Sequence, residues 1–396
     1  MIAVAALGYF VDIFDLALFG IVRVQSLRDL GLAGPELLSE GVHLLNAQMT
    51  GLLLGGLFWG VLGDKLGRLK VLFGSIFLYS IANLANAFVQ SPIQYACLRF
   101  VAGLGLAGEL GAAITLVAET LPTQKRGYGT AIVAGFGLSG AVAAGSLAEL
   151  ISWRSTYLVG GCLGLLLLFL RFRVSESQLF AQTKFASNVK RGDLFQLFFP
   201  KTRLLRYLGC VLIAVPIWYC AGILMTFSPE IGEALNATGP LSAGKAILFS
   251  YVGVALGDVS SGILSQLLRS RKKVILGALV LEALFASIIL LSRQISPSHF
   301  YGLSFLIGLA TGYWAVFVTV TSEHFGTNLR STATTSAPNL VRASVVPMTL
   351  SLTHLKPYLG FLPSVALIGA VVFALAFFAL FLLEETFSKD LNYLEL

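Results

Sequence analysis

The sequence has few charged residues. Asp, Glu, Lys and Arg make up only 12% of its 396 residues, whereas a soluble domain carries about 25%. A chain of this composition cannot build a water-facing surface, which excludes a soluble globular protein. The sequence features of common enzyme classes are missing as well, because it contains no G-x-S-x-G motif, no nucleotide-binding glycine loop and no histidine cluster. We therefore expect no enzymatic activity, no cofactor and no metal site.

Cysteine is also scarce. The four cysteines lie within apolar runs, at Cys97, Cys162, Cys210 and Cys220. Their spacing is not that of a metal site or of a disulfide framework. The net charge of +7 comes largely from basic residues in alternate connecting segments, such as Lys65 and Arg68, or Arg271 and Lys272. This is the positive-inside distribution of membrane proteins, so it does not indicate nucleic-acid binding.

Long apolar runs are abundant. Hydrophobic residues make up 56% of the chain, and its mean hydropathy is +0.84. A run of about 20 apolar residues spans the hydrocarbon core of a bilayer as an α-helix. We predict twelve such spans, at 2–22, 43–63, 70–90, 94–118, 128–149, 153–172, 204–227, 244–264, 274–292, 299–321, 334–355 and 361–383. They are too long and too continuously apolar for barrel strands, so an all-α, multi-pass membrane protein is predicted.

The ends of the chain are predicted to lie in the cytoplasm. The first run is not a cleaved signal peptide, because it has no basic segment before it and no small-residue cleavage site. With the N-terminus inside, the Lys and Arg clusters also fall inside, as the charge bias requires. The compact loops and the lack of a targeting segment indicate the inner membrane of a bacterium.

The longest polar break divides six spans from six. It covers residues 173–203 and separates an N-terminal bundle, 1–172, from a C-terminal bundle, 204–396. The halves share a motif, since ETLPTQKRGYGT at 119–130 aligns with EHFGTNLRSTAT at 323–334, which lies 204 residues further on. Transporters are often built from such repeats. We predict two pseudo-symmetric six-helix bundles in the same orientation.

A second repeated segment resembles a family signature. GVLGDKLGRLK at 60–70 aligns with GILSQLLRSRK at 262–272, with Gln266 in place of Asp64. The first of these segments resembles the signature loop of the major facilitator superfamily. Four further segments resemble conserved parts of its metabolite:proton symporter and sugar and organic-ion porter branches. They are GYFVDIFDLALFG (8–20), RFVAGLGLAGE (99–109), RVSESQLF (173–180) and EETFSKDLNYLE (384–395).

This resemblance implies a fold and a mechanism. The major facilitator fold places two six-helix bundles around a central cavity lined by spans one, four, seven and ten. It implies alternating access, in which one bundle rocks against the other. In the symporter branch, the aspartate corresponding to Asp15 is the protonation site and the arginine corresponding to Arg99 is its partner.

Four charged residues in the first and fourth spans are candidates for proton coupling. Asp12 and Asp15 are three residues apart, so they lie on nearly the same face of a helix, and Arg99 is expected at a depth similar to that of Asp15. A carboxylate balanced between burial and a cation can load and release a proton. The alternative is a static neutral cluster. Glu109 is either a second proton site or a partner for a neighbouring helix.

Arg342 is the main candidate for binding substrate. No partner for it is evident at its depth in the second half, and an unpaired cation in a membrane is costly. An anionic solute is therefore expected to dock on it, and the alternative is a salt bridge to Asp12 or Glu109. Polar aromatic residues and one amide are expected to complete the binding wall, although aromatic residues in spans often serve packing. These are Trp218, Tyr219, Tyr313, Trp314 and Asn339.

A gate is expected on the cytoplasmic side. Asp64 and Arg68 would close it, the former by pairing with a basic residue or with a helix N-terminus. Further members are expected at Glu119, Arg126, Glu323 and Arg330. The alternative is that these charges only set topology. Asp258 is expected to make a gate contact, and Glu282, in a peripheral span, has no predicted role.

The predicted function is transport. The sequence favours proton-coupled uptake of a small organic solute, in particular an organic anion such as a carboxylate, by a monomer in a lipid bilayer. The alternatives are a carrier of a neutral or zwitterionic metabolite, such as a sugar, polyol or betaine, and an exporter or antiporter of the same fold.

Overall fold

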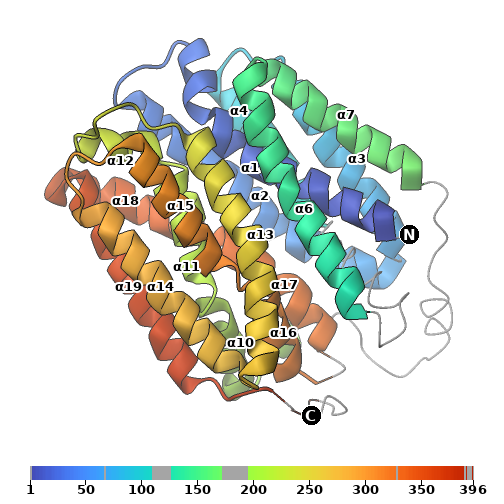
Figure 1. The fold of residues 1–396 in the computed structure, drawn as a ribbon. Helices are drawn as coiled ribbons and strands as arrows, with labels where there is room; N and C mark the ends of the chain where they lie inside the picture. Colours follow the sequence, from blue (N-terminus) through green and yellow to red (C-terminus); the bar gives the residue numbers. More distant parts are fainter. Residues whose placement is uncertain are drawn as a thin grey trace.

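The computed structural model describes residues 2–66, 68–108, 126–171, 195–326, 329–387, 389 and 395, and this part of the chain contains helices and no strand. The first half supplies α1 (Ile2–Asp29), α2 (Glu36–Leu66), α3 (Arg68–Asn86), α4 (Pro92–Leu106), α6 (Arg126–Leu150) and α7 (Trp153–Arg171). These helices form one group, coloured blue to green in Figure 1.

The second half forms the neighbouring group, coloured yellow-green to red (Figure 1). It begins with α9 (Phe195–Phe198), α10 (Lys201–Leu212), α11 (Val215–Tyr219), the π-helix η1 (Cys220–Met225) and α12 (Ser228–Ala234). It continues with α13 (Ala243–Leu267), α14 (Arg271–Leu291), α15 (Pro297–Thr311) and α16 (Trp314–His324). It ends with α17 (Arg330–Ala343), α18 (Val345–Leu359) and α19 (Phe361–Leu382).

Serine residues begin several of these helices. The side chains of Ser91, Ser242 and Ser270 each accept a hydrogen bond from the backbone amide three residues on. Such a cap satisfies one of the free N–H groups at a helix N-terminus. Pro92 follows the first of these serines, and proline is well tolerated at this position because its missing N–H would be unbonded anyway. Local sequence therefore explains where these membrane helices start.

Three of the predicted spans are broken into two helices. The axes of Lys201–Leu212 and Val215–Met225 differ by 40°. Pro216 lies directly after this bend and has no N–H to donate, and the amide of Ile217 bonds to Ala214 instead of to Ile213. Spans ten and eleven are interrupted at Gly312–Tyr313 and at Ser344.

The apolar surface fits a lipid environment. Five described helical segments are long and apolar enough to cross a membrane, and the bent α10–η1 pair is a sixth. Large apolar side chains project outward from peripheral helices, including Leu281 and Leu284 of α14 and Phe378 and Phe381 of α19. A soluble protein does not expose such continuous apolar faces. The chain is a multi-pass integral membrane protein.

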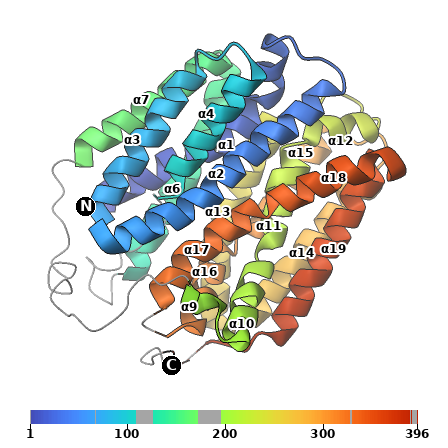
Figure 2. The same cartoon turned by 180° about the vertical axis from the view of Figure 1, so that it is seen from behind.

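Close helix contacts hold each bundle together. In the first bundle α1 packs on α6 and α2 on α4, and in the second α13 packs on α15. Glycine permits the last contact, since a Cβ at Gly253 would lie 2.2 Å from the carbonyl oxygen of Phe305. The bundles meet where α6 contacts α13 and where α17 and α18 lie beside α2 (Figure 2). A site at this interface can draw on both halves.

Candidate functional site

A small central cavity lies between the two bundles. Its volume is about 60 Å³, whereas pockets for small organic ligands measure about 300–1,000 Å³. Both halves line it, through Tyr9, Ile13, Leu16, Leu138, Ile217, Trp218, Cys220, Ala221, Ser250, Tyr251, Val254, Asp258, Thr311, Trp314 and Arg342. A small organic solute would fit only after this cavity widens.

Arg342 and Asp12 form an ion pair across the two bundles. Nη2 of Arg342 lies 3.8 Å from Oδ2 of Asp12, and both side chains are buried. This distance allows attraction but is too long for a hydrogen bond. Nε and Nη1 of Arg342 have no hydrogen-bond partner in the described part of the chain. The structure thus contains the salt bridge that the sequence left as an alternative, while donors of Arg342 remain unused beside the cavity.

Asp15 and Arg99 lie together inside the first bundle and do not line the central cavity. Both are fully buried. Nη2 of Arg99 donates to Oδ1 of Asn83, and its guanidinium lies 4.8 Å from the centre of the Tyr157 ring. Asp15 is within electrostatic reach of Arg99, although its oxygens have no hydrogen-bond partner among the described residues. Asp15 and Arg99 thus lie within electrostatic reach of each other, and neither is among the residues that line the central cavity.

The expected aromatic wall is only partly assembled. Trp218 and Trp314 line the central cavity, but the adjacent residues Tyr219 and Tyr313 do not. Neighbouring side chains on a helix point about 100° apart, so Tyr219 of α11 faces its own bundle when Trp218 faces the cavity. Tyr313 lies in the break before α16 and also faces its own bundle. There the hydroxyl of Tyr219 donates to the carbonyl of Val365 at 2.9 Å, and that of Tyr313 to the carbonyl of Ile213 at 2.8 Å.

Asn339 also lies away from this cavity. Its Nδ2 donates to the carbonyl oxygen of Ala107 in the first bundle, at 3.5 Å, and to that of Thr335, at 3.4 Å. The amide therefore connects the bundles.

Asp258 is a cavity residue to which the sequence assigned another role. It comes from α13, lines the cavity and accepts a hydrogen bond from the amide of Ala315 at 2.9 Å. Because α16 restarts at Trp314, its first amides need acceptors, and Asp258 supplies one. The sequence placed this residue near the end of its span and could not show that a neighbouring helix is broken at the same level.

A second cross-bundle ion pair closes the distal end, the end where α1 finishes and α13 begins. Nη2 of Arg23 lies 2.7 Å from Oε2 of Glu230 and also donates to the carbonyl of Thr226. Nη1 donates to the carbonyl of Leu37, and the guanidinium lies 4.6 Å from the ring centre of Phe227. Arg23 is fully buried. The sequence placed it just outside the first span, because a basic residue after an apolar run resembles an ordinary loop residue.

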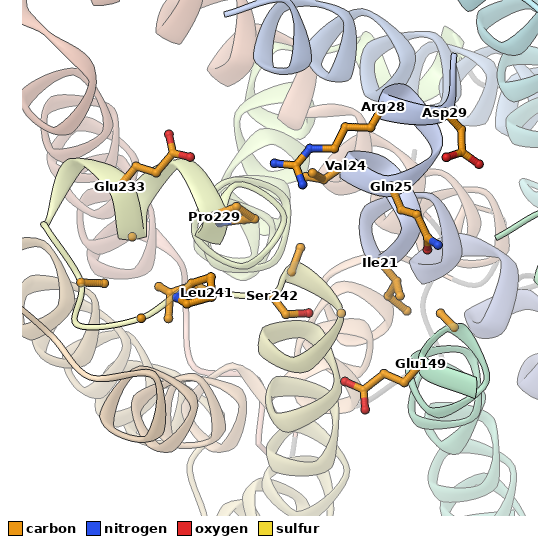
Figure 3. Close-up of a pocket in the computed structure, with 18 of the residues that line it drawn as sticks. Ile21, Val24, Gln25, Arg28, Asp29, Glu149, Pro229, Glu233, Leu241 and Ser242 are labelled. Atoms are coloured by element: carbon orange, nitrogen blue, oxygen red, sulfur yellow. The ribbon is translucent and has the colours of Figure 1, made fainter. Parts of the chain in front are cut away.

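A larger distal cavity of about 810 Å³ lies next to this ion pair. Figure 3 shows Arg28 and Asp29 of α1, Glu149 of α6 and Glu233 of α12 around it. At its rim Nζ of Lys245 lies 3.7 Å from Glu149 of the other bundle. A further cavity of about 30 Å³ reaches from Leu16 and Trp218 of the central cavity toward Thr226. Thr226, whose carbonyl accepts a hydrogen bond from Arg23, lines this further cavity.

The predicted cytoplasmic gate is only partly within the described residues. Glu119 lies outside them, as do the side chains of Asp64, Arg68 and Arg126. Glu109, the predicted proton-coupling residue of the fourth span, also lies outside the described residues. Glu323 pairs with Arg271 at 3.4 Å and accepts from Thr386 at 2.6 Å. Arg330 donates to the carbonyls of Ser322 and Phe325. These contacts of Glu323 and Arg330 lie within the second bundle.

Glu385 forms a further anchor at this end of the molecule. Partial burial raises its pKa, but hydrogen bonds from the Ser270 hydroxyl and the amides of Arg271, Phe387 and Lys272 outweigh it and lower the pKa to about 2. The carboxylate therefore stays ionised at physiological pH and fixes the segment after α19 to the start of α14.

The fold agrees with the comparison to known families. The sequence profile described as Major Facilitator Superfamily matches residues 5–345. The chain belongs to the Major Facilitator Superfamily. The predicted family and fold class are thereby confirmed.

Individual superfamily members extend this comparison. The chain is 26% identical over 388 residues to a probable 4-methylmuconolactone transporter of Cupriavidus pinatubonensis, covering 96% of this chain and 89% of that protein. It is 28% identical to the cis,cis-muconate transport protein of Acinetobacter baylyi, over 87% and 84% of the two chains. A crystal structure of a D-xylose-proton symporter superposes with a TM-score of 0.73 at 16% identity, over 98% of each chain. The family and these relatives are transporters and not enzymes, as predicted.

Proposed function

We propose that this transporter takes up a small organic anion together with protons, by alternating access, in the inner membrane of a bacterium. The observation that carries this proposal is the Asp12–Arg342 pair beside the central cavity. Arg342 has unused N–H donors there, and planar guanidinium groups bind carboxylates well. The names of the two relatives, a muconate and a muconolactone transporter, support solutes of this class.

The proposed cycle exchanges one anion for another at Arg342. As the cavity widens, the carboxylate of the solute replaces Asp12 next to the guanidinium. Asp12, deprived of its cation in a low-dielectric setting, takes up a proton. The loaded site then carries no extra charge relative to the empty one, which favours the change of side. Release of both solute and proton restores the ion pair.

The apolar part of the cavity suits an unsaturated or ring-containing solute. Tyr9, Trp218, Tyr251 and Trp314 all line it. Aromatic side chains stack on planar groups and keep a polar edge available for hydrogen bonding. We propose that Asp15 and Arg99 provide a second protonation site within the first bundle, which the cycle reaches in another conformation.

A second candidate function has its own supporting observation. In this conformation Asp12 already neutralises Arg342, so a neutral or zwitterionic metabolite could bind without a countercharge. The two candidates predict different effects of Asp12→Asn. If the protein carries an anion, Asp12→Asn leaves Arg342 without its countercharge, so the variant binds the anion more tightly. The same variant no longer accumulates the anion in response to a proton gradient.

Proteoliposomes provide the test. Purified protein is screened by thermal shift against cis,cis-muconate, aromatic carboxylates, polyols and betaines, and the best ligand is used in uptake driven by an imposed pH gradient. We expect stabilisation by carboxylates and loss of uptake in Arg342→Ala. Truncating one partner of a buried charge pair costs about 2–5 kcal/mol of binding, which is roughly 30-fold or more in affinity. Full anion transport by Arg342→Ala and Arg342→Lys would contradict the proposal.

A further inference from the structure

Glu282 is a buried acid that neither the cavities nor the ion pairs above involve. It lies near the middle of α14 and has no exposed surface. Its two carboxyl oxygens have no hydrogen-bond partner in the described part of the chain. No described Lys or Arg acts on it electrostatically. An ionised carboxyl group in such a place would be very costly.

Two titratable groups lie within electrostatic reach of Glu282. They are the Tyr313 hydroxyl, at the break between α15 and α16, and the Cys220 thiol, at the start of η1. The helix α19 also packs against α14, but its residues Phe361–Leu382 include no titratable side chain. Apart from burial, the Tyr313 hydroxyl is therefore the main influence on Glu282.

The hydroxyl hydrogen of Tyr313 already takes part in another hydrogen bond. Tyr313 donates it to the carbonyl oxygen of Ile213 at 2.8 Å. That carbonyl is free because Ile217 bonds to Ala214 at the bend between α10 and α11. A tyrosine has one O–H donor, so toward Glu282 it can only accept. A carboxylate is also an acceptor only, whereas a protonated carboxyl group has a donor.

We propose that Glu282 carries a proton and donates it to the oxygen of Tyr313. A continuous chain then runs from Glu282 through Tyr313 to the carbonyl of Ile213. It joins the bend of span seven to the break of span ten, next to Trp218 and Trp314 of the cavity wall. Glu282 is thus a positioning residue that fixes the cavity wall without touching the solute, whatever that solute is.

Infrared difference spectroscopy tests the protonation directly. The difference between wild type and Glu282→Gln is expected to show the C=O band of a protonated acid, and not carboxylate bands, from neutral pH to pH 9. Glu385→Gln is the matched control and should show carboxylate bands, because Glu385 has a pKa of about 2. Tyr313→Phe should move the acid band to the frequency of an acid without an acceptor. Carboxylate bands from Glu282 at neutral pH would overturn the proposal.

Tryptophan fluorescence tests the positioning role without requiring transport. Glu282→Gln keeps an N–H donor and should retain the wild-type emission maximum and melting temperature. Glu282→Leu removes the donor and should shift the emission of Trp218 and Trp314. Its ligand affinity, measured with cis,cis-muconate if that is bound, should fall about fivefold, the size expected for one hydrogen bond. Identical emission spectra for the Gln and Leu variants would contradict the role. The infrared and fluorescence measurements test this proposal even if proton-coupled anion uptake is disproved.

Discussion

Arg23 of the first bundle and Glu230 of the second are joined at the distal end by an ion pair of 2.7 Å. Two backbone carbonyls, of Leu37 and Thr226, accept further hydrogen bonds from the same guanidinium. The pair therefore fixes α1 against α12 and the end of η1, beside the small cavity that Thr226 lines.

Arg23→Gln is expected to open this end. Loss of a buried ion-pair partner costs about 3–5 kcal/mol, so the closed arrangement loses most of its local stabilisation. A cysteine introduced at Thr226 should then react much faster with a membrane-impermeant maleimide. Arg28→Gln is the matched control, because Arg28 lies on the same helix and lines the distal cavity.

Exchanging the two charges should not restore closure. Two of the acceptors for Arg23 are backbone carbonyls, and a glutamate at position 23 cannot donate to them. We therefore expect fast labelling at position 226 in the double variant Arg23→Glu/Glu230→Arg. Labelling at the wild-type rate would show that electrostatic attraction alone closes this end.

Asp258→Ala is expected to destabilise α16. The variant leaves the Ala315 amide without its acceptor, and loss of such a helix cap costs about 0.5–2 kcal/mol. Asp258→Asn keeps an acceptor oxygen and should melt close to wild type. If Asp258→Asn and Asp258→Ala lower the melting temperature equally, the charge of Asp258 stabilises α16 and its hydrogen bond to the Ala315 amide does not.

Gly253→Ala is expected to separate α13 from α15. A Cβ at this position would lie 2.2 Å from the carbonyl oxygen of Phe305, and overpacking of this kind costs about 1–3 kcal/mol. Gly262→Ala on the same helix is the control, since nothing lies within 4 Å of its Cβ. The control should be neutral or slightly stabilising, because alanine has the higher helix propensity.

The Glu385 anchor should depend on pH. Its pKa is lowered from 4.5 to about 2 in the folded protein, so its contribution to stability is present above about pH 4.5 and is lost as the pH falls toward 2. Glu385→Gln should therefore melt below wild type at pH 7, and the two curves should converge under acidic conditions. A difference that persists unchanged at low pH would show that the carboxylate charge is not responsible.

The sequence determined the membrane fold and the charged residues in its spans. Runs of about 20 apolar residues need helices, because backbone groups in lipid must bond within their own segment. Each predicted span accordingly overlaps described helices. However, α1 and α2 extend seven residues beyond one predicted end, spans seven, ten and eleven are broken, and span four is described only to residue 108. The buried position of Asp12, Asp15, Arg99 and Arg342 followed from the same patterns.

Only the tertiary structure decided which charged residues pair with each other. Periodicity shows which residues share one helix face, but it cannot show which face of another helix lies opposite. Arg342 therefore meets Asp12 from 330 positions away in the chain, and Arg23 meets Glu230, although neither pair has a local signal. Helix breaks have the same origin, because a freed carbonyl or amide is tolerated in a membrane only where a distant side chain, such as Tyr313 or Asp258, satisfies it.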